Sequence, residues 1–477
     1  MSELPSGWVH ARLDDLVDLN PKQNFDDELT AGFVPMSLAP TNFRDKLRFD
    51  ERNWGEIKKA YTNFKDGDVI FAKVTPCFEN GKAAVVDGLP NGIGAGSSEF
   101  FVLRPSSAEI PAKYLLALIK NRDFMREGAA NMTGAVGLRR VPKQFVESYV
   151  VSVPPAAEQI RIAQKLNELL TQVDTLKPRI DAIPALIKRF HQSVLAAAIS
   201  GELTNEWRQN SPATKVPYAT SKEEIAFDGI ESKEKYFNEP STWQWMRLGA
   251  AASLINGDRG KNYPNKSEYV AQGLPFINTG HIEPNGTISI HRMNFITKEK
   301  FDSLRGGKIK NGDLVYCLRG ATMGKTAIVA PFEAGAIASS LVIIRTNSLL
   351  LPKFAYYFLT SPQGKSLIKR FDNGSAQPNL SAGSLSSYPV AIPPLSEQTE
   401  IVRRVEQLFA FADQLEAKVT SAKKCIDHLT QSILAKAFRG ELVPQDPNDE
   451  PASVLLERIK AQRAAAPKAK HGRKTSA

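Results

Sequence analysis

The sequence predicts an α+β protein in which two structurally similar domains are separated by a pair of long antiparallel coiled-coil helices, with a pseudo-twofold internal duplication. The chain has 477 residues, and a single hydrophobic core usually serves no more than roughly 250–300. Residues 149–203 align on residues 388–442 without a gap at an offset of 239, with 19 identities in 55 positions. Both segments repeat apolar residues at helical spacing. These observations predict a duplicated unit made of one variable domain followed by one helix.

The duplication divides the chain into six segments. Upstream of the aligned segments the match is looser: Trp8 corresponds to Trp243, and KDGDVIFAK corresponds to KNGDLVYCL. We therefore expect, in order, a first domain over 1–153, a central helix over 154–203, a linker over 204–242, a second domain over 243–392, a C-terminal helix over 393–442 and a basic, partly disordered tail over 443–477.

Each variable domain shows short β-type runs followed by helical ones. Runs rich in β-branched and aromatic residues, such as 68–73 and 313–318, are separated from their neighbours by Gly, Asn and Pro. Helix-like stretches follow at 111–125 and 352–370. This order is typical of α+β domains.

The two aligned segments each predict a long helix. Apolar residues alternate at spacings of four and three from Ile162 to Val194 and, in the same register, from Ile401 to Ile433. A 3.5-residue repeat over about four heptads is typical of a coiled-coil seam. Each helix is expected to start after its Pro-Pro pair and to end at the glycine of its GEL sequence.

The first helix contains two prolines, Pro178 and Pro184, where we expect a kink or a short break. The two apolar seams could pair with each other, or each could join a foreign helical bundle. We expect them to pair within the chain. The pairing should be antiparallel, because a parallel pair would bring both domains to the same end of the helices.

The charge of the chain is unevenly distributed. The net charge is +10, and residues 241–390 alone carry 17 Lys and Arg against 8 Asp and Glu. A basic domain favours binding to a polyanion such as DNA.

Composition argues against several classes of protein. No stretch approaches about 18 consecutive apolar residues, so no membrane segment is expected. The start MSELPSGWVHARLDD lacks the basic and apolar regions of a secretory signal. Three cysteines are too few for a disulfide framework. We therefore expect a cytoplasmic protein that makes no use of a membrane.

No catalytic or metal-binding motif is repeated in the two halves. GATMGKT at 320–326 resembles a phosphate-binding loop, but it is one residue too short between its glycines. The six histidines show no ligand spacing, so no metal site is expected. Val153 and Ile392 precede the Pro-Pro pairs, where an amino-methyltransferase has Asp or Asn. A duplicated scaffold without a duplicated active site favours a binding protein over an enzyme.

The repeated helical segments resemble one known family. Both carry PPxxEQ at the start and QSxLxxAxxGEL near the end, and IVRRVEQLFAFAD follows the second start. Divergent domains that alternate with such segments resemble the specificity subunit of Type I restriction-modification enzymes, over nearly the whole chain. The resemblance implies two target-recognition domains, each of which recognises one half of an asymmetric, bipartite site in double-stranded DNA.

The resemblance also implies partners. Family members assemble with two methyltransferase (modification) subunits, which methylate adenine N6, and with ATP-dependent restriction and translocase subunits. We therefore expect a non-catalytic chain that binds no cofactor itself, with S-adenosylmethionine, ATP and Mg on the partner subunits.

DNA contacts are expected from side chains that reach phosphates or base edges. Arg can bind guanine through two hydrogen bonds, and Asn or Gln can bind adenine in the same way. Such residues occur in the loops TGAVGLRRV and NGSAQPNLS and in a polar, basic stretch of the second domain. The candidate DNA-binding residues are Arg139, Arg140, Arg259, Lys261, Asn262, Asn278, Ser375, Gln377 and Asn379.

Two alternatives stay open at this point. One is a stand-alone coiled-coil scaffold or DNA-binding regulator without a methyltransferase partner, and the other is an NTP-using enzyme built on GATMGKT. A neighbouring gene that encodes an Asn/Asp-Pro-Pro-Tyr/Phe motif would support the specificity subunit, whereas ATP binding by the isolated chain would support the enzyme.

Overall fold

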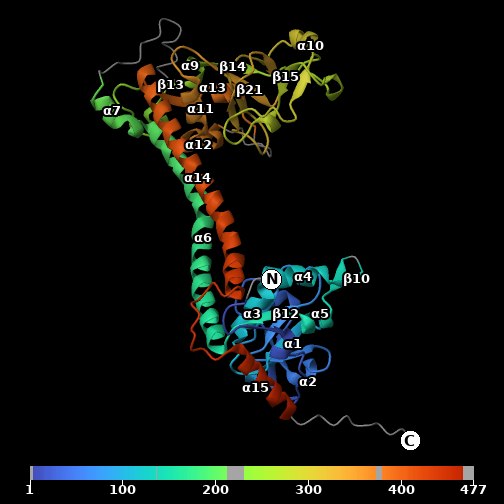
Figure 1. Ribbon diagram of the computed structural model, residues 1–477. Coiled ribbons are helices and arrows are strands. Elements are labelled where there is room, and N and C mark those ends of the chain that lie inside the picture. The colour runs from blue at the N-terminus through green and yellow to red at the C-terminus, as the bar shows by residue number, and fades with distance from the viewer. Residues whose placement is uncertain (1–3, 136, 212–229, 372–378, 466–477) are drawn as a thin grey trace. The chain divides into compact units, whose positions relative to one another are not determined.

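Figure 1 shows the computed structural model, which describes residues 4–135, 137–211, 230–371 and 379–465. The chain forms two compact units. The first unit consists of Met1–Asp181 together with Thr420–Ala477, and the second consists of Ala182–Val419. Each unit therefore contains one variable domain and parts of both long helices.

The first unit is built on two four-stranded sheets. One sheet has the order β2 (Val17–Leu19), β9 (Phe100–Pro105), β6 (Val69–Ala72), β7 (Ala83–Val85). The other has the order β4 (Asp50–Asn53), β3 (Thr30–Val34), β8 (Ile93–Gly96), β5 (Thr62–Lys65). All pairs are antiparallel except β3 with β8, which is parallel.

Short helices and a terminal strand pair complete this domain. The strands β1 (Val9–Arg12) and β12 (Val150–Val153) pair at the two ends of the domain sequence. The helices are α1 (Leu13–Leu16), α2 (Trp54–Ile57), α3 (Ala112–Lys120), α4 (Arg122–Ala130) and α5 (Lys143–Ser148). Large apolar side chains from β6, β9, α3 and α4 share one buried cluster, so the helices cover the β2–β9–β6–β7 sheet.

The second unit repeats the topology of both four-stranded sheets. Its sheets have the orders β14 (Ala252–Asn256), β21 (Leu341–Thr346), β18 (Leu314–Cys317), β19 (Thr326–Ile328) and β16 (Asn294–Ile296), β15 (Leu274–Ile277), β20 (Gly335–Ile337), β17 (Lys308–Ile309). The parallel pair, β15 with β20, takes the place of β3 with β8. The remaining elements are β13 (Gln244–Arg247), paired with β22 (Pro389–Ile392), and the helices α9 (Leu248–Ala251), α10 (Lys298–Ser303), α11 (Pro352–Thr360), α12 (Pro362–Phe371) and α13 (Ala382–Ser386).

An equivalent ion pair lies in both domains. Arg104 contacts buried Asp68 at 2.7 Å, and Arg345 contacts buried Asp313 at 2.7 Å. Each arginine lies on the strand that follows the parallel pair, and each aspartate lies in the GD turn of the matched sequences KDGDVIFAK and KNGDLVYCL. The duplication therefore extends into the variable domains, as the sequence predicts.

The two long helices, α6 (Ala156–Ser200) and α14 (Leu395–Phe438), pair antiparallel. In the first unit the beginning of α6 shares a buried cluster with the end of α14, including Ile162 and Ile433. In the second unit the end of α6 shares a cluster with the beginning of α14, including Val194 and Ile401. The prediction of intramolecular, antiparallel pairing is confirmed.

The prolines of α6 do not interrupt it. The helix runs without a break from Ala156 to Ser200, so of the kink or short break expected near Pro178 and Pro184 the break is wrong, whereas the kink stays a prediction. A proline inside a helix removes one backbone hydrogen bond, and its ring clashes with the carbonyl four residues earlier. Together these effects cost roughly 3 kcal/mol of helix stability. Buried apolar residues on both sides, Val173 and Ile187, hold the helix against its partner and offset this cost.

Two ordered segments were not predicted. The helix α15 (Ala452–Ala465) lies in the expected basic tail, and Ala452, Leu455 and Ile459 are buried in the core of the first domain. The helix α7 (Asn205–Gln209) lies in the expected linker. The helix α15 is ordered by packing on a domain distant in sequence, and α7 is attached to the start of α14 by the ion pair of Arg208 with Glu397. Local periodicity reports neither contact.

Candidate nucleic-acid interface

The repeated PPxxEQ motif attaches each domain to its helix. The indole of Trp8 donates to Glu158 at 2.9 Å, and the indole of Trp243 donates to Glu397 at 2.9 Å. The amides of the following glutamines donate to the carbonyls of Pro154 and Pro393 at 3.0 and 2.9 Å. These contacts are the same in both units, so the motif has a structural role: it fixes the position of each variable domain on the start of its helix.

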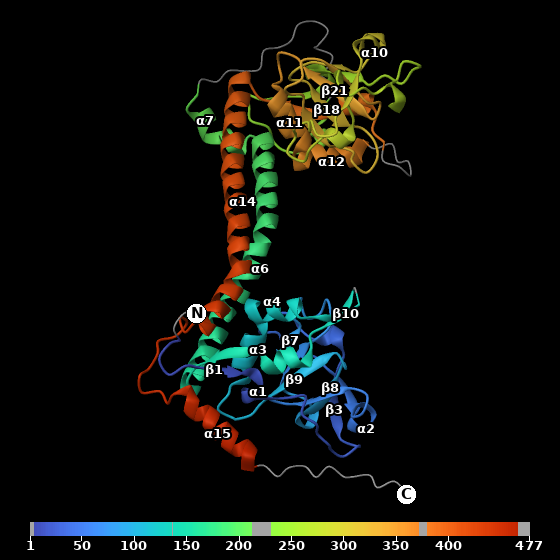
Figure 2. The same cartoon turned by 45° about the vertical axis from the view of Figure 1, so that its right-hand side comes forward.

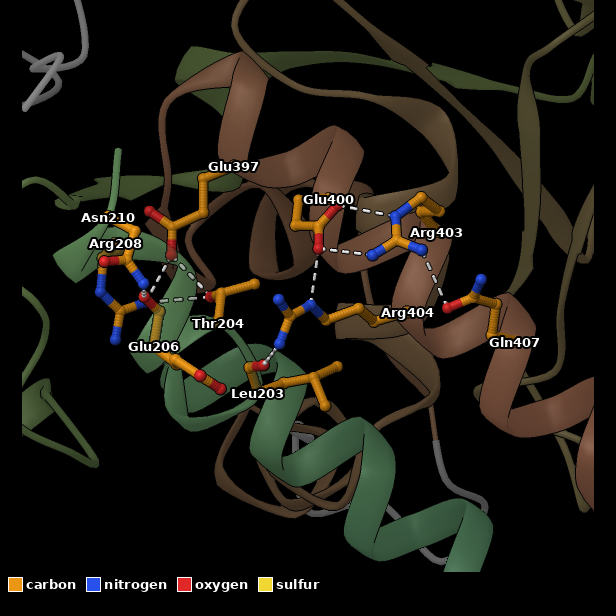
Figure 3. A network of polar contacts seen from close by, with 10 residues as sticks. All are labelled: Leu203, Thr204, Glu206, Arg208, Asn210, Glu397, Glu400, Arg403, Arg404 and Gln407. Carbon is orange, nitrogen blue, oxygen red and sulfur yellow. Dashed lines mark hydrogen bonds and ion pairs between the residues drawn. The ribbon is translucent and has the colours of Figure 1, made fainter. Parts of the chain in front are cut away.

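A polar network fixes the start of α14 further (Figure 3). Glu397 also accepts hydrogen bonds from Thr204 and Arg208, and the guanidinium of Arg404 donates to the carbonyl of Leu203 at 3.0 Å. Hydrogen bonds from Arg403, with a further contribution from Arg404, lower the pKa of Glu400 to about 2. These groups bond to one another, so the network positions the start of α14.

The first-domain candidates Arg139 and Arg140 lie on a small hairpin at one edge of the first unit (Figures 1 and 2). Its strands are β10 (Thr133–Ala135) and β11 (Leu138–Arg140). At Gly134 the φ angle is +127°, and a Cβ would lie 2.6 Å from the carbonyl oxygen of Leu138, so this position requires glycine.

The hairpin is attached to the sheet through its backbone. The amide of Thr75 donates to the carbonyl of Arg139 at 3.0 Å, and the amide of Val141 donates to the carbonyl of Lys73 at 2.8 Å. Residues 73–75 directly follow β6. The position of β11 is therefore set by the core sheet.

The two arginine side chains have different surroundings. Arg139 lies 3.7 Å from Glu79, and 46% of its side chain is exposed. Arg140 donates to both carboxylate oxygens of Glu99, at 2.7 to 3.1 Å, while 43% of its side chain stays exposed. Both side chains are thus accessible, and one of them is held in a fixed orientation.

The second domain attaches its corresponding loop in the same way. Asn379 forms a β-bridge with Arg319, as Arg140 does with Val74. The amide of Leu380 donates to the carbonyl of Leu318 at 2.9 Å, as that of Val141 does to Lys73. Asn379 is therefore the structural equivalent of Arg140. The other candidates of this loop, Ser375 and Gln377, lie outside the described residues.

The remaining candidates follow strands of the second domain. Arg259 and Lys261 are exposed, and Asn262 donates to the carbonyl of Ser303 at 2.8 Å. Asn278 follows β15, and its side chain accepts from the amide of Gly280 at 2.8 Å. Arg259 and Lys261 therefore present exposed charges, Asn262 connects its loop to the end of α10, and Asn278 stabilises its own turn.

Backbone contacts bring these loops to one edge of the second domain. A Cβ on Gly257 would lie 2.7 Å from the carbonyl oxygen of Ala338, so the loop after β14 approaches the end of β20 closely. The amide of Ala338 donates to the carbonyl of Ile277 at 2.8 Å, and that of Leu318 donates to Ser340 at 3.0 Å. The loop 257–262, Asn278 and Asn379 therefore lie along the same edge.

Sequence reasoning missed the acidic residues beside the hairpin, Glu99 and Glu79. Glu99 lies 41 positions from Arg140, and no local pattern pairs the two. The exposed leucine of the hairpin, Leu138, which is 52% accessible, was also not singled out.

The described part of the chain shows neither a membrane-spanning helix nor a metal-binding group. Its helices include none that is both long and apolar enough to cross a membrane. Within the same residues, no group of His, Cys, Asp and Glu side chains could hold a metal ion.

Comparison with known proteins identifies relatives that span the whole duplication. The specificity subunit of the Type I restriction enzyme EcoKI from Escherichia coli (strain K12) is 30% identical to this chain, and the alignment covers 99% of both. The EcoAI specificity subunit from Escherichia coli is 28% identical and covers 91% of this chain and 83% of the relative.

Solved structures share the fold. The HsdS subunit from Thermoanaerobacter tengcongensis has a TM-score of 0.66 at 22% identity, covering 92% of this chain and 98% of that one. A chain from a study of complex assembly and conformational transition of the type I R-M system has a TM-score of 0.57 at 20% identity. The family model described as the Type I restriction modification DNA specificity domain matches residues 5–185 and 240–422, once in each half of the duplication. Because these matches cover most of the chain, it belongs to the Type I restriction modification DNA specificity family.

Proposed function

We propose that this chain is the DNA sequence-specificity subunit of a Type I restriction-modification complex. It binds an asymmetric, bipartite site in double-stranded DNA, with one half-site for each domain. The observation that carries the proposal is the equivalence of Arg140 and Asn379, two base-recognising residue types at the same place on a duplicated scaffold. A common scaffold with different side chains at this place suits recognition of two different half-sites.

Charge supports the same function. The second domain contains most of the excess positive charge of the chain, with 17 Lys and Arg against 8 Asp and Glu over 241–390. Arg259 and Lys261 lie on the same edge as Asn379, where they would contact phosphates and so position the domain. The DNA-binding set is thus Arg139, Arg140, Arg259, Lys261, Asn262, Asn278, Ser375, Gln377 and Asn379.

The long helices offer a surface for the partner subunits. Several apolar side chains of the predicted seam are not buried by the other helix: Leu176 and Leu429 in the first unit are 43% and 40% exposed, and Phe190 and Leu415 in the second are 36% and 37% exposed. Repeated apolar residues on a helix are typical of a surface that docks further helices. We infer that two methyltransferase subunits bind here and that restriction and translocase subunits join them.

Under this proposal the chain is not an enzyme by itself. S-adenosylmethionine, ATP and Mg are bound by the partner subunits, and the chain determines which DNA they act on. It contributes binding energy and sequence specificity, since each domain holds one half-site.

The test is to express the chain with the methyltransferase of its gene neighbourhood and to map methylated adenines across the host genome. The expected result is one bipartite motif with an unread spacer. Exchange of residues 1–150 for those of a relative should change one half-site only. Methylation without any motif would refute the proposal, and DNA binding without methyltransferase binding would instead support a stand-alone regulator.

A further inference from the structure

The pair Glu99–Arg140 has a geometry that suits base recognition. Glu99 accepts hydrogen bonds from Nε and Nη2 of Arg140, at 2.7 to 3.1 Å. These bonds occupy one edge of the planar guanidinium, whereas the Nη1 edge makes no contact with Glu99. Because 43% of the whole side chain is exposed, Arg140 keeps accessible surface beyond its contact with Glu99, and a guanidinium can make a second, bidentate contact through its other edge.

The pair is not needed to hold the hairpin in place. The backbone around Arg140 is already fixed by the hydrogen bonds from Thr75 to Arg139 and from Val141 to Lys73. The pair therefore orients a side chain on a strand whose position is determined independently. Removal of the Glu99 carboxylate should leave the backbone of the hairpin in its place.

A carboxylate at this place is unfavourable for DNA affinity, because it repels phosphates. The hydrogen bonds from Arg140 hold the pKa of Glu99 below its ordinary value, so this carboxylate is charged at neutral pH. A charged group that opposes binding but orients an arginine is expected to contribute discrimination between sequences and not overall affinity.

We propose that Glu99 is a positioning residue for sequence specificity: it holds Arg140 so that its free edge recognises a guanine in the first half-site. The inference rests on the proposed function, which it deepens by assigning separate roles. Arg140 contacts the base, and Glu99 acts only through Arg140.

The second domain provides an internal comparison. Ser340 accepts a backbone hydrogen bond from Leu318, as Glu99 does from Lys73, so Ser340 takes the place of Glu99. This domain thus has Ser340 and Asn379 at the positions of Glu99 and Arg140. The asparagine side chain has fewer rotatable bonds than an arginine, so it needs no carboxylate to orient it. The second half-site should not depend on Glu99.

The experiment selects binding sites from randomised duplex DNA with the full chain, alone and with its co-expressed methyltransferase. The variants are Glu99→Gln, Arg140→Gln and Arg140→Lys. Glu147→Gln is the matched control, because Glu147 also pairs with a cation, Lys143 at 2.7 Å, but on the nearby helix α5. For each variant we measure Kd for the selected site, for the site with the guanine replaced, and for unrelated DNA, over a range of salt.

Arg140→Gln and Arg140→Lys should both lose roughly tenfold or more of the discrimination at one guanine. The lysine variant should keep the salt dependence of binding, because it keeps the charge. Glu99→Gln should lose discrimination at the same guanine, with binding to unrelated DNA unchanged or tighter. The control and the second half-site should be unchanged.

Other outcomes separate the hypotheses. If wild type enriches a site and Arg140→Gln enriches the same site with unchanged discrimination, Arg140 does not recognise a base and the inference is wrong. If Glu99→Gln weakens binding to all sequences equally, Glu99 only supports the fold, and the inference is again wrong. If the wild-type chain enriches no sequence in either form, the proposed function fails and the inference fails with it.

Discussion

Glu158 and Glu397 occupy equivalent positions at the starts of the two long helices, and each accepts a hydrogen bond from a tryptophan indole at 2.9 Å, but only Glu397 is also paired with an arginine. Both side chains are buried. The other oxygen of Glu158, Oε1, is buried and has no hydrogen-bond partner among the described residues. The glutamate of the duplicated motif therefore contributes differently to the stability of the two units.

Glu397→Ala should destabilise the second unit by roughly 3–5 kcal/mol, because it strands a largely buried arginine and a buried indole. The midpoint of urea unfolding of the full chain, followed by tryptophan fluorescence, measures this loss. Glu206→Gln is the control, since Glu206 is an exposed neighbour on α7. Equal stability of wild type and Glu397→Ala would contradict the network shown in Figure 3.

Glu158→Gln should reduce the pH dependence of the stability of the first unit. Burial raises the pKa of Glu158, so between its ordinary and its raised pKa the folded chain binds more protons than the unfolded chain. The stability contributed by protonated Glu158 is therefore lost as pH rises through this window. Unfolding measured from pH 4 to pH 8 should show a smaller loss for Glu158→Gln than for wild type. An identical pH profile would show that Glu158 is not desolvated.

Lys120 predicts a second pH dependence in the first unit. Burial lowers its pKa to about 7, and its ammonium donates to the carbonyls of Thr41 and Gly81 at 2.8 and 2.7 Å. Above about pH 7 the unfolded chain binds more protons than the folded one, so stability should rise with pH toward the ordinary lysine value. Lys120→Met should lack this rise. The exposed Lys113 supplies the control Lys113→Met, which should keep it.

Two leucines of α6 distinguish folding from partner binding. Leu170 is 2% exposed and Leu176 is 43% exposed. Leu170→Asp should unfold the first unit, since it loses several kcal/mol of burial and leaves a charge in the seam. Leu176→Asp should keep the circular dichroism spectrum of wild type but reduce co-purification with the methyltransferase. Retained co-purification would place the partner elsewhere.

The long helices could be predicted because their apolar repeat is local and continues over many turns, from Ile162 to Val194 in the first case. The choice of buried positions was less accurate. The spacing of four and three from Ile162 predicts Leu169 in the seam, but Leu169 is only partly buried and its neighbour Leu170 is fully buried. The register of a helix pair depends on the shape of the partner, which spacing alone does not contain.

The candidate site could be predicted only in part. The loop that carries Arg139 and Arg140 stood out by its glycines and arginines, and its equivalence with Asn379 follows from the backbone bridges. The contact of Arg140 with Glu99 joins two strands far apart in sequence, so it emerges only once the sheet is formed. The packing of α15 could not be predicted for the same reason: its Leu455 and Ile459 are buried in the core of the first domain, which is far away in sequence.

Helix α15 also determines when the first domain can be completed. Residues 182–419 of the second unit are contiguous in sequence, whereas the first unit combines residues from both ends of the chain. On the ribosome, the second unit therefore emerges in full before the segments that cover Ile162, Leu166 and the core around Leu116. The N-terminal domain, although translated earlier, keeps this apolar surface uncovered until residues 420–465 have been synthesised, so we expect it to complete its core after the second unit.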